Sequence, residues 1–212
     1  MTPIPSIARR LLAPALLLPG LLCLPLPTLA IELETLAAAL AARGADSTTY
    51  EQTRYLGILD EPLESSGRLA FEPPDRLVQE QLAPEPRTLI LDGEEMTYSA
   101  AGRERVVSLD DSPQGAALAA SLRGILNGQV EALRDDYELV LRERAGDGWQ
   151  LNLLPLTEEL ADRIRRIEVI GQFRDQRAEV ERMTLEFANG DRSVMRLGVP
   201  AGDAPDREPT SP

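Results

Sequence analysis

The feature that most constrains the fold is a repeated alternation of apolar and polar residues, in two blocks separated by a helical segment. Short alternating runs recur between residues 48 and 108 and again between 137 and 197. A period of two is the pattern of a β-strand that buries one face. Asp92-Gly93 and Asn189-Gly190 are typical hairpin turns between such runs. The pattern predicts an α+β fold built on a curved antiparallel β-sheet, an open half-barrel of roughly nine to eleven strands with helices covering its concave side.

Helices are predicted at the start and in the middle of the chain. Residues 31–43 carry leucines at helical spacing, and Gly44 follows them. Residues 113–127 place leucines on one face, and several alanines keep this helix slim. A shorter helix is predicted over 157–163, with Thr157 as its capping residue.

The register of the last hairpin stays open in the sequence. A two-residue turn at Asn189-Gly190 would pair Leu185 with Val194. Alternation instead puts Met195 on the same face as Leu185. A one-residue bulge would reconcile the two patterns.

The N-terminus has the three parts of a secretory signal peptide. Arg9 and Arg10 precede a short apolar run, and the small residues of 28–30 suit cleavage before Ile31. This predicts a signal peptide over 1–30, a half-barrel domain over 31–198, a disordered acidic and proline-rich tail over 199–212, and a periplasmic location.

Cys23 permits a second reading of the same segment. A cysteine after an apolar run could be the lipid-attachment site of an anchored lipoprotein. The residue before it is Leu22, whereas lipoprotein signals require a small residue there. An incidental cysteine within a removed signal peptide is the stronger interpretation.

The composition excludes most catalytic chemistry. The chain contains 22 arginines, no lysine and no histidine, and its formal net charge is −13. Without histidine, lysine and a cysteine in the exported chain, there is no imidazole base, Schiff-base lysine or thiol nucleophile, and a zinc site is disfavoured. An acidic surface also repels nucleic acid. We expect a non-enzymatic monomer without a cofactor or metal.

The paired acids do not restore an enzyme. Asp110-Asp111 precedes Ser112 and Pro113, which is the pattern of a helix start rather than of a catalytic dyad. An acyl-transfer or hydrolytic enzyme is therefore the last of three hypotheses, after the two binding functions described below.

Several motifs, taken in order, resemble the periplasmic lipoprotein-carrier family LolA. They are spread over residues 31 to 198, and none is specific alone. The matching pieces are Tyr50-x-Gln52, Gly67-x-Leu69, Leu89-Ile90-Leu91-Asp92-Gly93 followed by Met96 and Tyr98, and Trp149-x-Leu151-x-Leu153-x-Pro155.

The resemblance implies an open half-barrel with a helical lid that carries acyl chains from an inner-membrane donor to an outer-membrane acceptor. The best-known carriers have Arg-Pro just after the second strand, and that arginine ties down the lid. This chain has Pro73-Pro74 there. Arg54 or Arg68 could substitute, or the lid could be held by apolar contacts. The departure indicates a specialised relative whose cargo is a lipoprotein or another lipid.

The predicted ligand contacts are apolar residues on the inward face of the sheet and on the central helix. They are Leu69, Phe71, Leu89, Leu91, Met96, Tyr98, Leu118, Leu122, Leu126, Leu139, Leu151 and Leu153. Periodicity cannot distinguish a hollow that takes acyl chains from a packed core made by the same residues. A second hypothesis is an envelope sensor or scaffold that uses the same fold to bind a protein partner.

Overall fold

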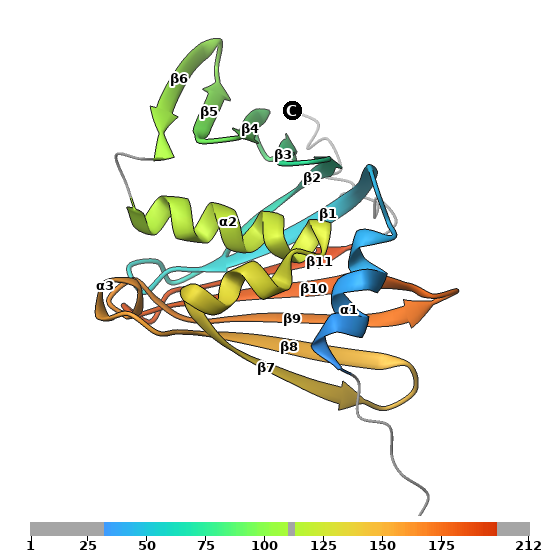
Figure 1. Cartoon of the computed structure of the whole chain (residues 1–212). Coiled ribbons are helices and arrows are strands. Elements are labelled where there is room, and N and C mark those ends of the chain that lie inside the picture. Colours follow the sequence, from blue (N-terminus) through green and yellow to red (C-terminus); the bar gives the residue numbers. More distant parts are fainter. Residues whose placement is uncertain (1–31, 110–112, 199–212) are drawn as a thin grey trace, which may run out of the picture.

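The computed structural model describes residues 32–109 and 113–198, which form one open antiparallel sheet with helices on its concave side (Figure 1). The predicted signal peptide, Cys23, the Asp110–Ser112 helix start and the C-terminal tail lie outside the described residues. The elements in chain order are α1 (Leu33–Ala41), β1 (Asp46–Tyr55), β2 (Leu63–Glu72), β3 (Arg76–Ala83), β4 (Arg87–Asp92), β5 (Glu95–Ala100), β6 (Arg103–Ser108), α2 (Pro113–Asn127), the 3₁₀ helix η2 (Val130–Asp135), β7 (Tyr137–Arg144), β8 (Gly148–Pro155), α3 (Glu158–Ala161), β9 (Ile164–Arg174), β10 (Arg177–Phe187) and β11 (Arg192–Leu197).

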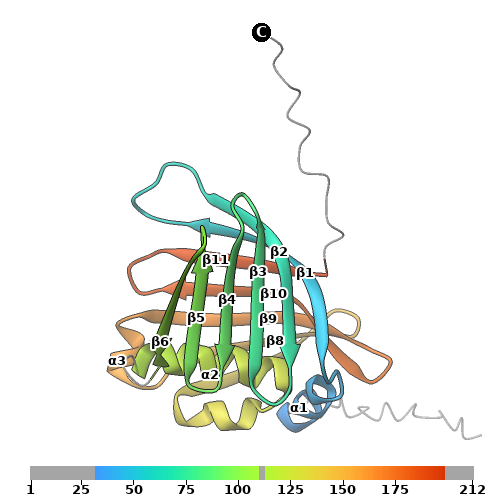
Figure 2. The same ribbon diagram turned by 90° about the horizontal axis from the view of Figure 1, so that it is seen from above.

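All eleven strands belong to one sheet, in the order β6-β5-β4-β3-β2-β1-β11-β10-β9-β8-β7. The first and last strands of the sequence therefore pair at its centre, and the two alternating blocks form its two wings. Figure 2 shows the β2–β6 wing curling in front of the β8–β10 wing. The predicted α+β class and open curved sheet are confirmed. None of the helices in the described part of the chain is long and apolar enough to cross a bilayer.

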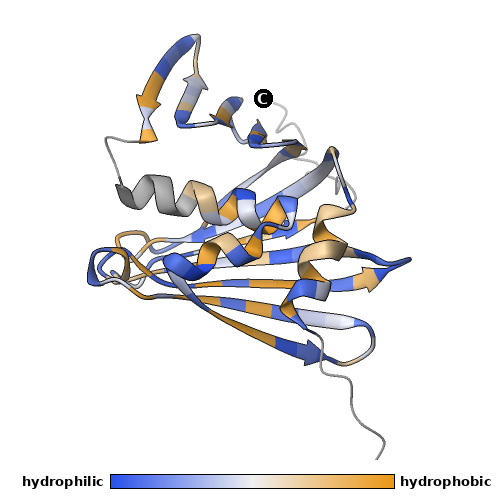
Figure 3. Ribbon diagram, in the orientation of Figure 1, coloured by the Kyte–Doolittle hydropathy of each residue, from blue (hydrophilic) through white to orange (hydrophobic). Residues whose placement is uncertain are grey.

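The helices bury an apolar stripe against the β7–β10 wing. Leu36 and Leu40 of α1 and Ile125 of α2 are fully buried, together with Leu151 and Val169 of the sheet. Hydrophobic segments recur along α1, β8 and β9 (Figure 3). These residues belong to one contiguous core, and their burial is the main favourable contribution to folding.

The structure gives the register of the last hairpin, in which Met195 lies on the same face of the sheet as Leu185. Met183 pairs with Met195, and Leu185 pairs with Ser193. The Phe187 amide donates to the Asp191 carbonyl at 2.9 Å, and Gly190 has a positive φ of 92°. The loop therefore holds one residue more than a two-residue turn, as in hairpins whose last loop residue is left-handed. This extra residue shifts the pairing and keeps the methionines inside.

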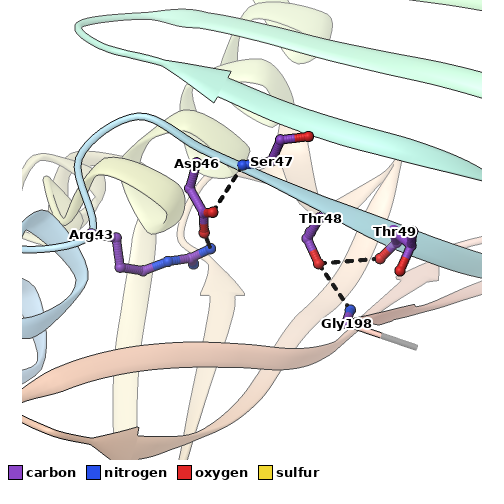
Figure 4. A network of polar contacts seen from close by, with 6 residues as sticks. All are labelled: Arg43, Asp46, Ser47, Thr48, Thr49 and Gly198. Carbon is purple, nitrogen blue, oxygen red and sulfur yellow. Dashed lines mark hydrogen bonds and ion pairs between the residues drawn. The ribbon is translucent and has the colours of Figure 1, made fainter. Parts of the chain in front are cut away.

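Polar contacts fasten the start of β1 to the end of β11 (Figure 4). Arg43 donates to Asp46 at 2.5 Å, and the Asp46 carboxylate accepts from the Ser47 amide at 2.8 Å. The Gly198 amide donates to the Thr48 hydroxyl at 3.1 Å. The first two bonds order the turn between α1 and β1, and the third joins β1 to the end of β11.

Gly171 is required by the packing of the chain's single tryptophan. A Cβ at Gly171 would overlap the Glu179 carbonyl and lie 2.5 Å from Cζ2 of Trp149, which is fully buried. We expect Gly171→Ala to lower the free energy of unfolding by about 1–3 kcal/mol, because overpacking forces the neighbours to shift. Urea unfolding followed by circular dichroism measures the change. Gly57→Ala is the control, since its nearest neighbour would be 3.7 Å away; equal stability of the two variants would contradict this account.

A carboxylate anchors the β1–β2 loop. Asp191 accepts from the Gly57 amide at 2.8 Å and from Asn189 at 2.9 Å. The Gly57 hydrogen bond, followed by those of Asn189 and the charge of Arg54, lowers the Asp191 pKa below its ordinary value of 3.8. The anchoring is therefore present above the ordinary pKa and is lost as pH falls through the lowered one.

The Gly57 amide proton should report this titration in an NMR spectrum. We expect the chemical shift of this proton to change only at a pH below the ordinary pKa of an aspartate. Asp191→Asn should abolish this change. Asp60→Asn, in the same loop, should leave it in place. A Gly57 titration that persists in Asp191→Asn would show that another group anchors the loop.

Candidate functional site

An open groove lies on the inward face of the sheet, in the part that the helices leave uncovered. Its volume is about 310 Å³, at the lower end of the range for ligand sites. It lies between the two wings, at the end that carries the β3–β4 turn and the β10–β11 hairpin. Its lining residues are Gln52, Arg54, Gln79, Gln81, Arg87, Leu89, Tyr98, Leu185, Phe187 and Ser193.

Hydrogen-bonded polar side chains cross the floor of the groove. Gln79 donates to the Gln52 side-chain oxygen at 3.5 Å, and Gln52 donates to the Ser193 hydroxyl at 2.7 Å. Burial raises the pKa of the Tyr50 phenol, and the nearby Gln79 side chain partly offsets this shift. Gly67 of β2 lies between Tyr50 and Gln81 in the register and carries no side chain. The side chains of β1 and β3 can therefore meet above it.

Two arginines stand at the rim of the groove, Arg54 on β1 and Arg87 on β4. Arg87 pairs with Glu85 at 3.1 Å, and both side chains are exposed. No acidic residue is among those that line the groove. The groove is thus amphipathic, with cationic and amide groups beside Leu89, Leu185 and an aromatic ring.

The predicted contact residues divide between this groove and the core. Leu89 and Tyr98 line the groove, and Tyr98 is 37% exposed. Others are partly buried against the core: Met96, Leu122 and Leu139. Six are buried within it: Leu69, Phe71, Leu91, Leu126, Leu151 and Leu153. The side chain of Leu118 lies outside the described residues.

The seam between α2 and the sheet is closely packed. A cavity beside Leu69, Phe71 and Leu126 has a volume of about 10 Å³, close to the space of a single water molecule. The buried contact residues are therefore covered while α2 lies in this position.

α2 is fastened to the sheet by its own side chains. Arg123 donates to the carbonyl of Gly93, in the β4–β5 turn. Asn127 donates to the carbonyl of Pro74 at 3.2 Å, within the dipeptide that replaces Arg-Pro. The predicted substitutes do not form these bonds, because Arg54 lines the groove and Arg68 faces outward, on the opposite side of β2 from Gly67 and Leu69. The side chains that fasten α2 therefore belong to the helix itself. A search for a substitute arginine on the strands could not reveal them.

Sequence reasoning missed the polar half of the groove. Gln52, Gln79 and Gln81 occupy inward positions where the strand alternation would place apolar residues. Such polar exceptions to a binary pattern are the signal that could have located the groove. Within residues 32–109 and 113–198, no group of three or more His, Cys, Asp or Glu side chains is placed to hold a metal ion.

Comparisons with solved structures give distant similarities. A LolA superfamily protein from Nitrosomonas europaea is 12% identical with a TM-score of 0.41, covering 78% of this chain and 89% of that chain. An outer membrane lipoprotein-sorting protein domain from Vibrio parahaemolyticus is 11% identical with a TM-score of 0.43, at 78% and 89% coverage. LprF from Mycobacterium bovis is 14% identical with a TM-score of 0.36, at 80% and 94% coverage.

The assignment to a family depends on the sequence itself. No curated protein sequence matches the chain. A protein-family model described as outer membrane lipoprotein carrier protein LolA-like matches residues 26–208, which is most of the chain. The chain therefore belongs to the LolA-like family of outer membrane lipoprotein carrier proteins.

Proposed function

We propose that this protein is a periplasmic carrier that binds acyl chains of a lipoprotein or another lipid on the concave face of its sheet. The observation that carries the proposal is the open groove beside Leu89, Tyr98 and Leu185, which no helix covers. Its family is described as carriers of lipoproteins, which supports binding without chemistry. Each methylene that leaves water contributes about 0.8 kcal/mol.

The proposal includes a donor protein in the inner membrane and an acceptor protein in the outer membrane. An inner-membrane protein loads the groove, and an outer-membrane protein receives the acyl chains. The predicted contacts that now lie in the core, such as Leu91 and Leu126, become available to cargo only when α2 moves away from the sheet. Release then requires a partner that binds the open state more tightly than the closed one.

Native mass spectrometry of the protein purified from its own periplasm, followed by organic extraction, tests the proposal directly. We expect a bound mass that disappears on extraction and a lipid in the organic phase. A protein that carries no lipid, takes up none when offered acyl lipids, and co-purifies with a stoichiometric protein partner would contradict the carrier and favour a sensor.

Leu89→Gln tests whether the groove is the site. The substitution puts an amide among the apolar groups that would contact the chain, so we expect acyl-lipid affinity to fall about tenfold or more. Fluorescent fatty-acid titration measures it. Leu82→Gln is the control, because Leu82 lies on neighbouring β3, is half-exposed and does not line the groove. Equal affinities for the two variants would exclude this groove.

Arg123→Ala tests the fastening of α2. A hydrogen bond from a charged group contributes about 1.5–3 kcal/mol, so we expect backbone amides of 119–127 to exchange with deuterium roughly tenfold faster. Arg134→Ala is the control, since Arg134 is exposed and pairs with Glu131 of its own helix. If exchange in α2 is equally slow in both variants, the lid is held by apolar packing.

A further inference from the structure

We infer that the groove selects lipids with an anionic head group, a phosphate or a carboxylate, and that Arg54 and Arg87 bind that group. The inference rests on the proposed function of the same groove and adds the class of ligand.

The lining of the groove departs from the charge of the whole protein. The chain has 35 acidic residues and a net charge of −13. The groove has two arginines, three glutamines and no acid among its ten lining residues. Amide and guanidinium groups present N–H donors, which an anion accepts. A protein that repels anions in general therefore has one recess whose donors suit them.

Both arginines can be reached by a ligand. Arg54 forms no ion pair with the residues the structure describes. Its charge acts on Asp191, whose oxygens already accept from Gly57 and Asn189. Arg87 interacts with Tyr98 of the same groove and forms the exposed ion pair with Glu85, and such surface pairs are weak and exchange readily. A planar guanidinium binds phosphate or carboxylate through two parallel N–H bonds.

Two strands that line the groove, β4 and β1, both become more buried from the open end of the groove towards the helices. Along β4, Arg87 is exposed, Leu89 is partly buried and Leu91 is 3% exposed. Along β1, from the loop towards α1, Arg54 is exposed, Gln52 is partly buried and Tyr50 is 1% exposed.

These parallel gradients match the outline of an amphiphile. Each strand runs from a cation at the open end to apolar, buried groups near the helices. Leu185 and Phe187 of β10 give the facing wall an apolar surface. A head group at the arginines would therefore place its acyl chain along Leu89 and Leu185, pointing towards α2. A neutral lipid would gain the apolar contacts alone.

The test compares lipids with one palmitoyl chain and different head groups. Palmitoyl lysophosphatidylglycerol and palmitate carry an anionic phosphate and carboxylate, whereas palmitoyl lysophosphatidylcholine and monopalmitoylglycerol have no net charge. Calorimetric titration of the purified protein gives each affinity. We expect the anionic lipids to bind about tenfold more tightly, and the difference to shrink in 0.5 M salt, because exposed charges are screened. The two anionic lipids then distinguish a phosphate ligand from a carboxylate ligand.

The variant Arg54→Gln with Arg87→Gln should lose this preference and bind the anionic lipids no more tightly than monopalmitoylglycerol. The matched control is Arg68→Gln with Arg196→Gln, which removes the same charge from exposed positions on the outward face of β2 and β11. We expect the control to keep the preference. Urea midpoints check that both proteins are folded.

The outcomes separate the two proposals. Equal affinity for anionic and uncharged lipids, or an unchanged preference in the Arg54 and Arg87 variant, would overturn the head-group inference and leave the carrier in place. Equal losses in the two double variants would show that only net charge matters, which also overturns it. No binding of any of the four lipids would reject the carrier function itself.

Discussion

The stability of the sheet depends on the burial of its concave face, and the helices are too few to cover all of it. An open eleven-stranded sheet exposes a large inward surface, and apolar surface must be removed from water for the sheet to be stable. α1, α2 and η2 supply the cover, with Leu36, Leu40 and Ile125 fully buried against the sheet. They are long enough for the β7–β10 wing and the helix-proximal ends of β2–β5. The rest of the face has no cover, and its residues are accordingly different.

The limited cover explains why packed core and open groove share the same strands. On β4, Leu91 is under the helices and Leu89 is beyond them. On β3, Leu77 is buried, whereas Gln79 and Gln81 line the groove. Polar side chains can occupy the uncovered inward positions because they bond to one another or to water. A sheet with leucine at all these positions would expose a large apolar patch and would aggregate more readily.

The elements of this fold could be predicted from the sequence because they depend on local periodicity. Alternation located the strands, and Thr157 was a correct helix cap, since its hydroxyl accepts from the Leu160 amide at 3.3 Å. The pairing of β1 with β11 could not be found this way, because partners as distant in sequence as Tyr50 and Leu197 leave no local pattern. Only that pairing brings Gln52 to Ser193 and closes the floor of the groove.

The candidate site was harder to predict than the fold for a related reason. Apolar periodicity marks inward positions without distinguishing covered from uncovered ones, and Leu151 and Leu89 satisfy it equally well. Which of them is covered depends on where α2 lies, and α2 is positioned by Arg123 and Asn127 through carbonyls of distant turns. Main-chain carbonyls carry no residue identity, so no sequence motif marks the partners of these two side chains.

The same arrangement connects cargo length to the position of α2. The apolar surface of the groove continues into the buried core, from Leu89 to Leu91 on β4 and from Leu185 to Met183 on β10. Under the proposed function, a short acyl chain occupies the open part, whereas a longer one reaches the helix and must displace it to bury more methylenes. Each added methylene favours displacement by about 0.8 kcal/mol, and the contacts of Arg123 and Asn127 oppose it. Under the proposed function, the strength of these contacts thus sets the chain length at which binding begins to open the lid.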